Sequence, residues 1–448
     1  MTNLSGANLN NGAAVGPQGE GRESPSRFPT YPAYKNSGVE WLGEVPEHWV
    51  MGSLKNMAQI RNGRDYKEVE SSDGEYPVIG SGGQFSNATQ YLYEGESVLL
   101  GRKGTIDKPL YINGRFWTVD TMFYTEISKE ACAKFFYYNS LTIPFGYYST
   151  STALPSMTQA DLLNHPAAIP TKLEQTQIAR FLDHETARID ALIEEQQRLI
   201  ELLKEKRQAV ISHAVTKGLD PTVPMKDSGV EWLGEVPAHW IVRKVSIDFQ
   251  ASKGPRGALL TKEYCHENPG EYPVYSGQTE NGGVLGEIAD YDFDLGAEGA
   301  ILSTTVGAKA MSVMHVSGRI SLSQNCMIIR PLSSDVKVGF YFYHLQPLFS
   351  LERRMIPDHM QPSFRMEDLY SFRVAVPPVG EQNQIADYLD STVSRFDELI
   401  GEGVNGINLL LERRSALISA AVTGKIDVRG WQPPASTQTP EFEVAEAH

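Results

Sequence analysis

Lys35-Asn-Ser-Gly-Val-Glu-Trp-Leu-Gly-Glu-Val-Pro-Glu-His-Trp49 decides the fold, because it returns as Lys226-Asp-Ser-Gly-Val-Glu-Trp-Leu-Gly-Glu-Val-Pro-Ala-His-Trp240. Thirteen of the fifteen positions are identical, at an offset of 191 residues. A second pair of blocks, Glu174–Ile193 and Glu381–Ile400, shares eleven of twenty positions at an offset of 207. The chain is therefore a duplication. Units of about 200 residues are domains rather than the short stacking repeats of a solenoid.

Two dissimilar middles, residues 50–172 and 241–379, lie between the repeated blocks and are rich in Gly, Tyr and Ser. Short β-favouring runs separated by Gly-rich turns predict the strands of a mixed sheet in each middle. One more helical run in each middle predicts an amphipathic helix packed on that sheet. The strand runs are Tyr76–Ile79, Ser97–Leu100, Phe116–Val119, Ala300–Ser303 and Cys326–Ile329, and the helical runs are Ala131–Tyr138 and Val338–Tyr343.

Each repeat ends in a predicted long helix. Residues 174–216 contain no Gly or Pro, and apolar residues recur every three or four positions, which is typical of a seam for another helix. About 42 residues at ~1.5 Å each make a helix of roughly 60 Å. The seam positions are Leu182, Ile189, Leu192, Leu199, Leu203 and Val210 in the first copy, and Leu389, Phe396, Leu399, Leu410 and Leu417 in the second.

Three glycines, Gly401, Gly403 and Gly406, fall inside the second helix. Each costs ~1 kcal/mol relative to Ala. We therefore expect a bent or loosely formed stretch there, unless the partner helix holds it.

Two long helices of similar pattern in one chain pack most economically on each other. We expect an α+β protein: two α/β globules separated by two long antiparallel helices, related by a pseudo-twofold axis. Packing of each helix on its own globule, or homodimerisation through the helices, stays open. The expected boundaries are a disordered tail at 1–33, a globule at 34–172, a helix at 173–220, a linker and globule at 221–379, a helix at 380–428 and a disordered acidic tail at 429–448.

The composition excludes several classes of protein. The 448 residues are 41% hydrophobic, and the three cysteines, Cys132, Cys265 and Cys326, form no CxxC pair, so a disulfide framework or a structural zinc site is not expected. There is no signal peptide and no run of ~20 apolar residues, which favours a cytoplasmic protein without a membrane span. The net charge of −15 argues at first against nucleic acid.

The residues that catalysis requires are not evident. The chain has no GxxxxGK[ST] phosphate loop, its ten histidines form no HExxH, and no PD…(D/E)xK nuclease arrangement is persuasive. We expect no catalytic residue and no metal site in this chain.

Together these motifs resemble the specificity (S) subunit of type I restriction-modification enzymes. The resemblance rests on both copies of Ser-Gly-Val-Glu-Trp-Leu-Gly-Glu-Val-Pro-x-His-Trp, on both copies of Glu-Gln-x-Gln-Ile-Ala-x-x-Leu-Asp, and on the helix end Leu202–Asp220. The first middle also resembles the family's target-recognition domains at Tyr76–Gly83, Gly101–Thr105 and Phe116–Asp120. Coverage runs from about 35 to 428, and the second middle carries the weaker signature.

The resemblance implies two target-recognition domains, each reading one half of a split, asymmetric site on double-stranded DNA. The paired helices would fix the unread spacer. The chain would carry no chemistry and no cofactor of its own. Two methyltransferase subunits, which use S-adenosylmethionine, and two motor-nuclease subunits, which use ATP and Mg²⁺, would assemble on it.

Dividing the charge by region removes the objection to DNA. Residues 50–172 hold 11 basic and 12 acidic residues, and residues 241–379 hold 13 and 15, so both middles are nearly neutral. Phosphate contacts need only a few nearby Lys or Arg, and amides beside glycines can pair with adenine. The candidate DNA contacts are Arg61, Arg64, Lys67, Gln84, Asn87, Arg102, Lys103 and Lys108 in the first middle, and Lys253, Arg256, Gln278, Asn281, Lys309, Arg353 and Arg354 in the second.

The repeated ends offer two equivalent surfaces, which suits two copies of one partner. The candidate partner contacts are Trp41, Trp49, Gln177, Ile178, Trp232, Trp240, Gln384 and Ile385. For the tryptophan segments, internal packing is an equally good interpretation. Two other functions stay open: an S subunit that serves a methyltransferase-only assembly, and a coiled-coil scaffold that binds protein alone.

Overall fold

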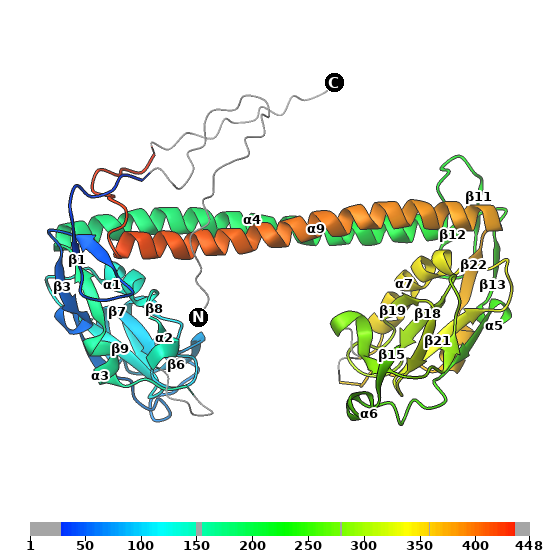
Figure 1. Cartoon of the computed structure of the whole chain (residues 1–448), viewed down its shortest axis with the longest axis horizontal. Coiled ribbons are helices and arrows are strands. Elements are labelled where there is room, and N and C mark those ends of the chain that lie inside the picture. The colour runs from blue at the N-terminus through cyan, green and yellow to red at the C-terminus, as the bar shows by residue number, and fades with distance from the viewer. Residues whose placement is uncertain (1–27, 149–154, 278–279, 358, 435–448) are drawn as a thin grey trace, which may run out of the picture. The chain divides into compact units, whose positions relative to one another are not determined.

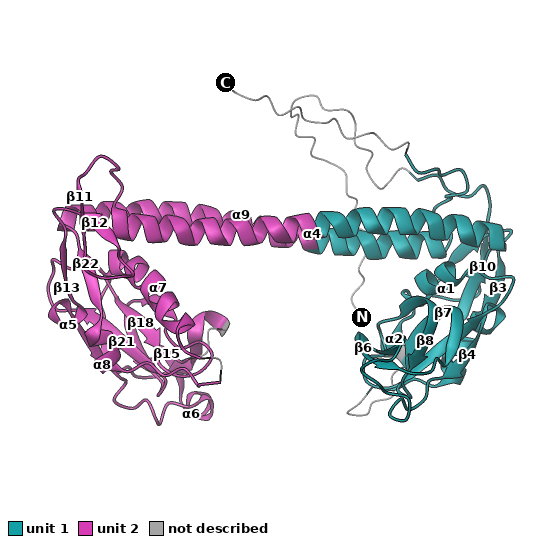
Figure 2. Ribbon diagram, turned by 180° about the vertical axis from the view of Figure 1, so that it is seen from behind, with its two compact units in different colours: residues 1–193, 408–448 teal, residues 194–407 magenta. Residues whose placement is uncertain are grey.

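The computed structural model describes residues 28–148, 155–277, 280–357 and 359–434. The chain divides into two compact units, residues 1–193 with 408–448 and residues 194–407 (Figure 2). Each unit holds one globule and one stretch of both long helices, α4 (Lys172–Lys217) and α9 (Val379–Val422). The duplication in the sequence is thus a duplication of architecture.

A six-stranded mixed sheet forms the first globule (Figure 1). Its strand order is β4-β9-β7-β8-β5-β6, and only the β5–β8 pair is parallel. A hairpin (β1–β2) and the pair β3–β10 flank it. The strands are β1 (Tyr34–Asn36), β2 (Glu44–Pro46), β3 (Val50–Ser53), β4 (Ala58–Asn62), β5 (Tyr76–Gly80), β6 (Gly83–Ala88), β7 (Tyr93–Gly101), β8 (Leu110–Thr118), β9 (Met122–Ile127) and β10 (Pro166–Ile169).

The core of the first unit lies between the sheet and four short helices, together with the beginning of α4 and the end of α9. Phe135 and Phe136 of α1 are fully buried against it, with Phe181 of α4. The short helices are η2 (Leu54–Asn56), α1 (Ala133–Ser140), α2 (Phe145–Tyr148) and α3 (Gln159–Asn164).

The second globule repeats these elements but divides the sheet. The counterparts of β7 and β8 are each broken in two, so two four-stranded sheets form, β14-β21-β18-β19 and β16-β15-β20-β17. The breaks fall around three positive-φ glycines, Gly296, Gly299 and Gly318. The strands are β11 (Met225–Asp227), β12 (Glu235–Pro237), β13 (Ile241–Lys244), β14 (Phe249–Ser252), β15 (Pro269–Tyr275), β16 (Val284–Ile288), β17 (Phe293–Asp294), β18 (Ala300–Thr304), β19 (Val313–Val316), β20 (Arg319–Leu322), β21 (Cys326–Pro331) and β22 (Arg373–Val376).

The helices of the second globule include α7, the counterpart of α1. They are α5 (Val245–Asp248), α6 (Lys262–Glu267), η3 (Glu280–Gly283), α7 (Val338–Arg354) and α8 (Met366–Ser371). The strand runs predicted from the sequence lie in β5, β7, β8, β18 and β21, with Val119 one residue beyond β8, and the helical runs lie largely in α1 and α7. The predicted mixed α/β globules are confirmed.

The two long helices run side by side in antiparallel order. In the first unit Arg414 of α9 pairs with Asp190 of α4 at 2.8 Å, and in the second Arg207 of α4 pairs with Asp397 of α9 at 2.9 Å. Residue numbers therefore rise along one helix as they fall along the other. The predicted antiparallel pair is confirmed.

The helix α9 continues without a break through all three glycines. A Cβ on Gly403 would lie 3.0 Å from Cγ1 of Ile200, whereas a Cβ on Gly401 or Gly406 would meet nothing within 4 Å. The two helices therefore approach each other closely at Gly403, and the contact with Ile200 of α4 supports α9 there.

The seam predicted for α4 is partly wrong. Leu182 and Ile189 are buried, but Leu192 and Leu199 are 41% and 46% exposed. Ile200 is buried instead. The buried or half-buried positions 189, 193, 196, 200, 203 and 207 also have 3–4 spacing, and they include the polar residues Gln196 and Arg207.

The expected disordered tails are also too long. Tyr31 is 3% exposed in the core of the first unit, and Phe28 packs edge-on against Phe181. Trp431 packs on the same phenylalanine, at a centroid distance of 5.3 Å. The aromatic residues at 28–31 and 431 therefore belong to the globule. In the described part of the chain, no helix is long and apolar enough to cross a membrane.

Candidate functional site

The His48-Trp49 end of the first repeated block contacts Glu174, the first residue of the second block, through side-chain hydrogen bonds. In the first unit the Trp49 indole donates to the Glu174 carboxylate at 3.0 Å, the Tyr31 hydroxyl donates to it at 2.7 Å, and the His48 ring lies 3.0 Å away. A Cβ on Gly424, just beyond α9, would lie 3.2 Å from the Trp49 ring. Trp49 thus joins the start of α4 to the end of α9.

We call this set of contacts around the tryptophan the clamp. The second unit has the same clamp, but there the tryptophan joins the start of α9 to the end of α4. The Trp240 indole donates to Glu381 at 2.9 Å, and the His239 ring lies 2.7 Å from the same carboxylate. Gly218, just beyond α4, lies against the Trp240 ring. In each half the two repeated motifs therefore contact each other, and within each unit they join the two long helices.

Four of the predicted partner contacts are corrected by this geometry. Trp49, Trp240, Ile178 and Ile385 are at most 2% exposed, so their side chains offer no surface to a partner. Internal packing therefore explains why these four residues repeat.

The other four predicted partner contacts are at least partly accessible. Trp41 is 46% exposed and stacks on His165 at a centroid distance of 5.1 Å, and Trp232 donates to the Arg373 carbonyl at 3.2 Å. Gln384 is exposed. Gln177 instead donates to the carbonyls of Val428 and Trp431, so the chain itself covers that face in the first unit.

Sequence reasoning missed the glutamine that follows the clamp carboxylate. Gln175 accepts from the Cys132 amide and donates to the Pro170 carbonyl, each at 2.9 Å. Gln382 accepts from the Lys337 amide at 2.8 Å in the same way. These amides tie the long helix to the start of α1 or α7. The exact repetition of Glu-Gln in both blocks was the available signal.

The loops at one end of the first sheet gather several predicted DNA contacts. The backbone amide of Arg64 bonds to Thr118, and those of Arg102 and Lys103 bond to Thr121. These hydrogen bonds place all three beside the β8–β9 turn. Arg64 and Lys103 are exposed, whereas the Arg102 guanidinium lies over the Phe123 ring and donates to the Asp120 carbonyl.

Some of the other candidates in the first unit are already engaged. Arg61 forms an ion pair with Glu126 at 3.2 Å, which raises its pKa, and Gln84 donates to Asn87 at 2.9 Å on the edge strand β6. Lys67 and Lys108 are exposed, and in the described part of the chain neither forms an ion pair. Arg61 is therefore the weakest of the basic candidates here.

In the second unit the equivalent sheet end carries Lys253 and Lys309, both exposed. Arg353 donates to the Ala308 carbonyl and so adjoins the Lys309 loop, and Arg354 is exposed. Asn281 sits in a turn at φ 51°, beyond the end of β15.

Two residues of the second list stand apart. Arg256 bonds to Asp290 at 2.8 Å and to Asp292 at 2.7 Å, which raises its pKa, so its charge is occupied within the domain. Gln278 lies outside the described residues.

One aromatic feature at the first sheet end was not predicted. Phe85 is 55% exposed on β6 beside Gln84, and its ring meets Tyr66 edge-on at 5.2 Å. Exposed rings can stack on bases or thymine methyl groups. The Gly80–Gly83 turn that precedes it was the available signal.

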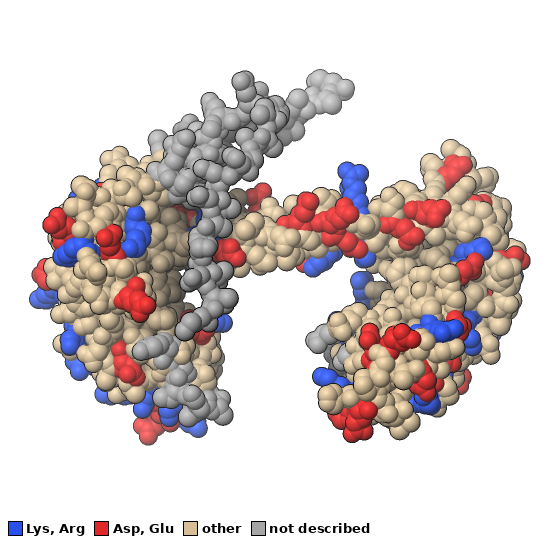
Figure 3. Space-filling model, in the orientation of Figure 1, with Lys and Arg blue, Asp and Glu red and all other residues tan. Residues whose placement is uncertain are grey.

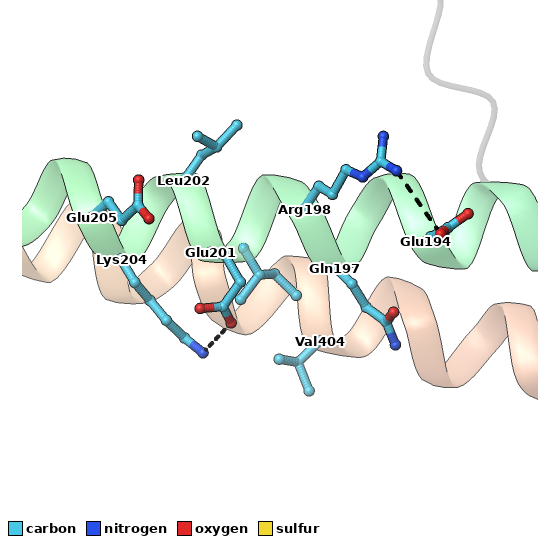
Figure 4. Close-up of a pocket in the computed structure, with 9 residues that line it drawn as sticks. Glu194, Gln197, Arg198, Glu201, Leu202, Lys204, Glu205 and Val404 are labelled. Atoms are coloured by element: carbon cyan, nitrogen blue, oxygen red, sulfur yellow. Dashed lines mark hydrogen bonds and ion pairs between the residues drawn. The ribbon is translucent and has the colours of Figure 1, made fainter.

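A stretch of the two long helices in the second unit presents apolar and acidic side chains together. Figure 3 shows acidic side chains gathered over α4 and α9, and Figure 4 shows a groove beside them. This groove, of about 840 Å³, is lined by Leu202 and Val404, which are 60% and 45% exposed. Glu201 pairs there with Lys204 at 2.9 Å. This face is a candidate surface for a protein partner.

The described residues contain no group of three or more His, Cys, Asp or Glu that could hold a metal ion. All three cysteines are free.

Comparison with known proteins identifies the family. The model for the type I restriction modification DNA specificity domain matches residues 46–203 and 249–408. The specificity subunit of the type I restriction enzyme MpnII of Mycoplasma pneumoniae is 30% identical over 161 residues, 36% of this chain and 45% of that protein. Another type I specificity-subunit sequence of that organism is 31% identical over 161 residues, 36% of this chain and 63% of that protein.

A solved structure from work on the assembly and conformational transition of the type I restriction-modification system shares the fold. Its TM-score is 0.64 at 14% identity, and the match covers 84% of this chain and 98% of the other. The chain spans about three fifths or less of the length of the two M. pneumoniae relatives. Because the family model matches both halves, this chain belongs to the type I restriction-modification DNA specificity family.

Proposed function

We propose that this chain is the non-catalytic specificity subunit of a type I restriction-modification complex acting on DNA in the cytoplasm. Each globule reads one half of a bipartite, asymmetric site in double-stranded DNA. The paired helices set the length of the unread spacer.

One observation carries this proposal: a single scaffold occurs twice and differs at the sheet end where basic and amide side chains gather. The first unit presents Arg64, Lys103 and Phe85 there, and the second presents Lys253 and Lys309. The same framework with different side chains is what two unlike half-sites require. Basic residues hold the phosphates, while the remaining groups discriminate bases.

The helices support the assembly part of the proposal. Two methyltransferase subunits dock on the chain, and two motor-nuclease subunits join them. Leu199 and Leu202 are exposed on the part of α4 that lies in the second unit, and exposed apolar side chains close together mark protein interaction sites. S-adenosylmethionine, ATP and Mg²⁺ serve those partner subunits, so this chain needs no cofactor.

A genome-wide map of adenine methylation, made with and without the gene in an active strain that carries the partner genes, tests the function. We expect one split motif to disappear when the gene is deleted. An unchanged map would contradict DNA specificity and leave the protein-only scaffold. Deleting the motor-nuclease gene should abolish restriction and leave methylation, whereas a strain that has no such gene would define a methyltransferase-only assembly.

A further inference from the structure

An exposed cluster of four side chains occurs in both globules. In the first, Arg115 pairs with Glu94 at 3.1 Å, and its guanidinium lies over the Tyr91 ring at 5.1 Å. Tyr76 meets Tyr91 edge-on at 5.2 Å. Hydrogen bonds with Glu94 and Tyr76 raise the pKa of Arg115.

The second globule builds the same cluster from equivalent residues. Arg319 pairs with Asp294 at 3.2 Å and lies over the Tyr291 ring at 4.9 Å. Tyr272 meets Tyr291 edge-on at 5.1 Å, and its hydroxyl lies 3.4 Å from the Arg319 guanidinium. Every contact of the first cluster therefore has its counterpart.

The backbone positions of the two clusters also agree. Glu94 and Arg115 face each other across β7 and β8, as Asp294 and Arg319 do across β17 and β20. The parallel neighbour, β5 or β15, supplies the first tyrosine in each unit. The cluster thus occupies the same place on both sheets.

The residues of the cluster are spaced differently along the chain in the two middles. The offset between equivalent residues is 196 at the first tyrosine, 200 at the second tyrosine and the carboxylate, and 204 at the arginine. Loops between these residues have changed length, and the second sheet has split, yet both tyrosines and the arginine are kept, and the carboxylate is Glu in one cluster and Asp in the other. An exposed cross-strand pair adds only ~0.2–1 kcal/mol to stability, so support of the fold is a weak reason to keep it.

The side chains of the cluster remain open to solvent. Arg115 and Arg319 are 49% and 50% exposed, and Tyr91 and Tyr291 are 42% and 38% exposed. Arginine and tyrosine are the residues that most often dominate the binding energy of protein interfaces. Because a carboxylate already neutralises each arginine and would repel phosphate, the cluster suits a protein better than a DNA backbone.

We propose that the Arg115 and Arg319 clusters are the contacts through which each recognition domain binds one methyltransferase subunit. This inference rests on the proposed function, because that function supplies a partner present in two identical copies. A surface duplicated on two otherwise different domains fits such a partner. The half-sites of DNA differ in sequence, so base reading gives no reason for identical clusters.

The test uses the full chain co-expressed with the methyltransferase subunit of its host, without DNA. Native mass spectrometry should give two methyltransferase copies for the wild type, one for Arg115→Ala or Arg319→Ala, and none for the double variant, with affinity per copy falling at least tenfold. Tyr91→Ala, which leaves the ion pair of the first cluster in place, should also lose one copy. Arg429→Ala is the matched control, since Arg429 likewise pairs with a carboxylate and lies over a tyrosine ring but is not duplicated.

The outcomes separate the two levels of the proposal. A wild-type chain that binds no methyltransferase would contradict the proposed function itself. Two bound copies in the double variant, or an equal loss with Arg429→Ala, would overturn the cluster assignment alone. Full stoichiometry with at least tenfold weaker DNA binding by the double variant would also overturn it and assign the clusters to the phosphate backbone.

Discussion

The Trp49 indole donates a 3.0 Å hydrogen bond to the Glu174 carboxylate, and this bond joins two sequence motifs that lie 125 residues apart. The Glu174 side chain is 5% exposed, whereas that of its counterpart Glu381 is 35% exposed. The carboxylate of the clamp is therefore buried in the first unit and partly exposed to solvent in the second.

Glu174→Gln should destabilise the protein more than Glu381→Gln. Removing a buried charged acceptor leaves its donors poorly satisfied, which costs about 1–3 kcal/mol. Water can replace the lost contacts at the more exposed Glu381. Thermal unfolding of the full chain measures both, and equal shifts in the unfolding midpoint would contradict the role of burial.

Gly401→Ala and Gly406→Ala should each stabilise the protein by up to about 1 kcal/mol, because Ala is the better helix former and a Cβ meets nothing at either position. Gly403→Leu should lower the unfolding midpoint, since its side chain would collide with Ile200. Urea unfolding checks all three. A stabilising Gly403→Leu would show that the helices do not meet closely there.

Stability should fall as the pH drops below about 6.5, in part because of His344. Burial lowers the pKa of this imidazole to about 3, so the unfolded chain binds a proton that the folded chain excludes. The stabilisation is complete above the unfolded pKa of about 6.5 and is lost at about 1.4 kcal/mol per pH unit on going down toward pH 3.

The contacts of His344 place its proton on Nδ1. This nitrogen faces the Val215 carbonyl, whereas Nε2 accepts a hydrogen bond from the Ala375 amide. His344→Gln should reduce the slope of unfolding free energy between pH 6 and pH 4. The residual slope should include His165, whose pKa burial lowers to about 4. An unchanged slope in the variant would contradict this assignment.

Arg64→Ala and Lys103→Ala should weaken DNA binding by the assembled complex about equally for all sequences. Each lost phosphate contact should reduce the slope of log affinity against log salt by about 1. Arg61→Ala and Arg256→Ala should change the slope less, because carboxylates already pair with both. Fluorescence anisotropy across a salt series measures this, and identical slopes for all four variants would refute the assignment.

Inserting one heptad at matched positions in α4 and α9 should lengthen the spacer and keep both half-sites. Seven residues add about 10 Å of helix, or roughly three base pairs of B-DNA at 3.4 Å each. A heptad preserves the 3–4 pattern of the seam. Methylation mapping reads the result, and altered half-sites with a fixed spacer would refute the geometry.

The repeat, the mixed globules and the antiparallel helices were predictable from the sequence, because periodicity and duplication are local signals. The seam of α4 was predicted one position away from the truth at Leu192 and Leu199. Two stripes with the same 3–4 spacing run along that helix, and Gly403 on α9 lies against the one that contains Ile200.

The individual contacts were less predictable. Trp49 and Trp240 repeat whether a tryptophan binds a partner or fills a core, so repetition alone could not decide between them. Whether a guanidinium is free depends on carboxylates distant in sequence, as Glu126 is from Arg61. The tyrosine clusters were not predicted, because Tyr76, Glu94 and Arg115 lie on three separate strands that only the folded sheet brings together.

The divided sheet of the second globule gives it a different unit of cooperativity. In the first globule, β7 and β8 run unbroken for nine residues each, so backbone hydrogen bonds join all six strands into one block. In the second, the sheet β16-β15-β20-β17, which carries Arg319 and is called the outer sheet here, shares no ladder with the inner sheet, β14-β21-β18-β19. Amide hydrogens of the outer sheet should therefore exchange in a sub-global opening while those of the inner sheet stay protected. The first globule should open only as a whole.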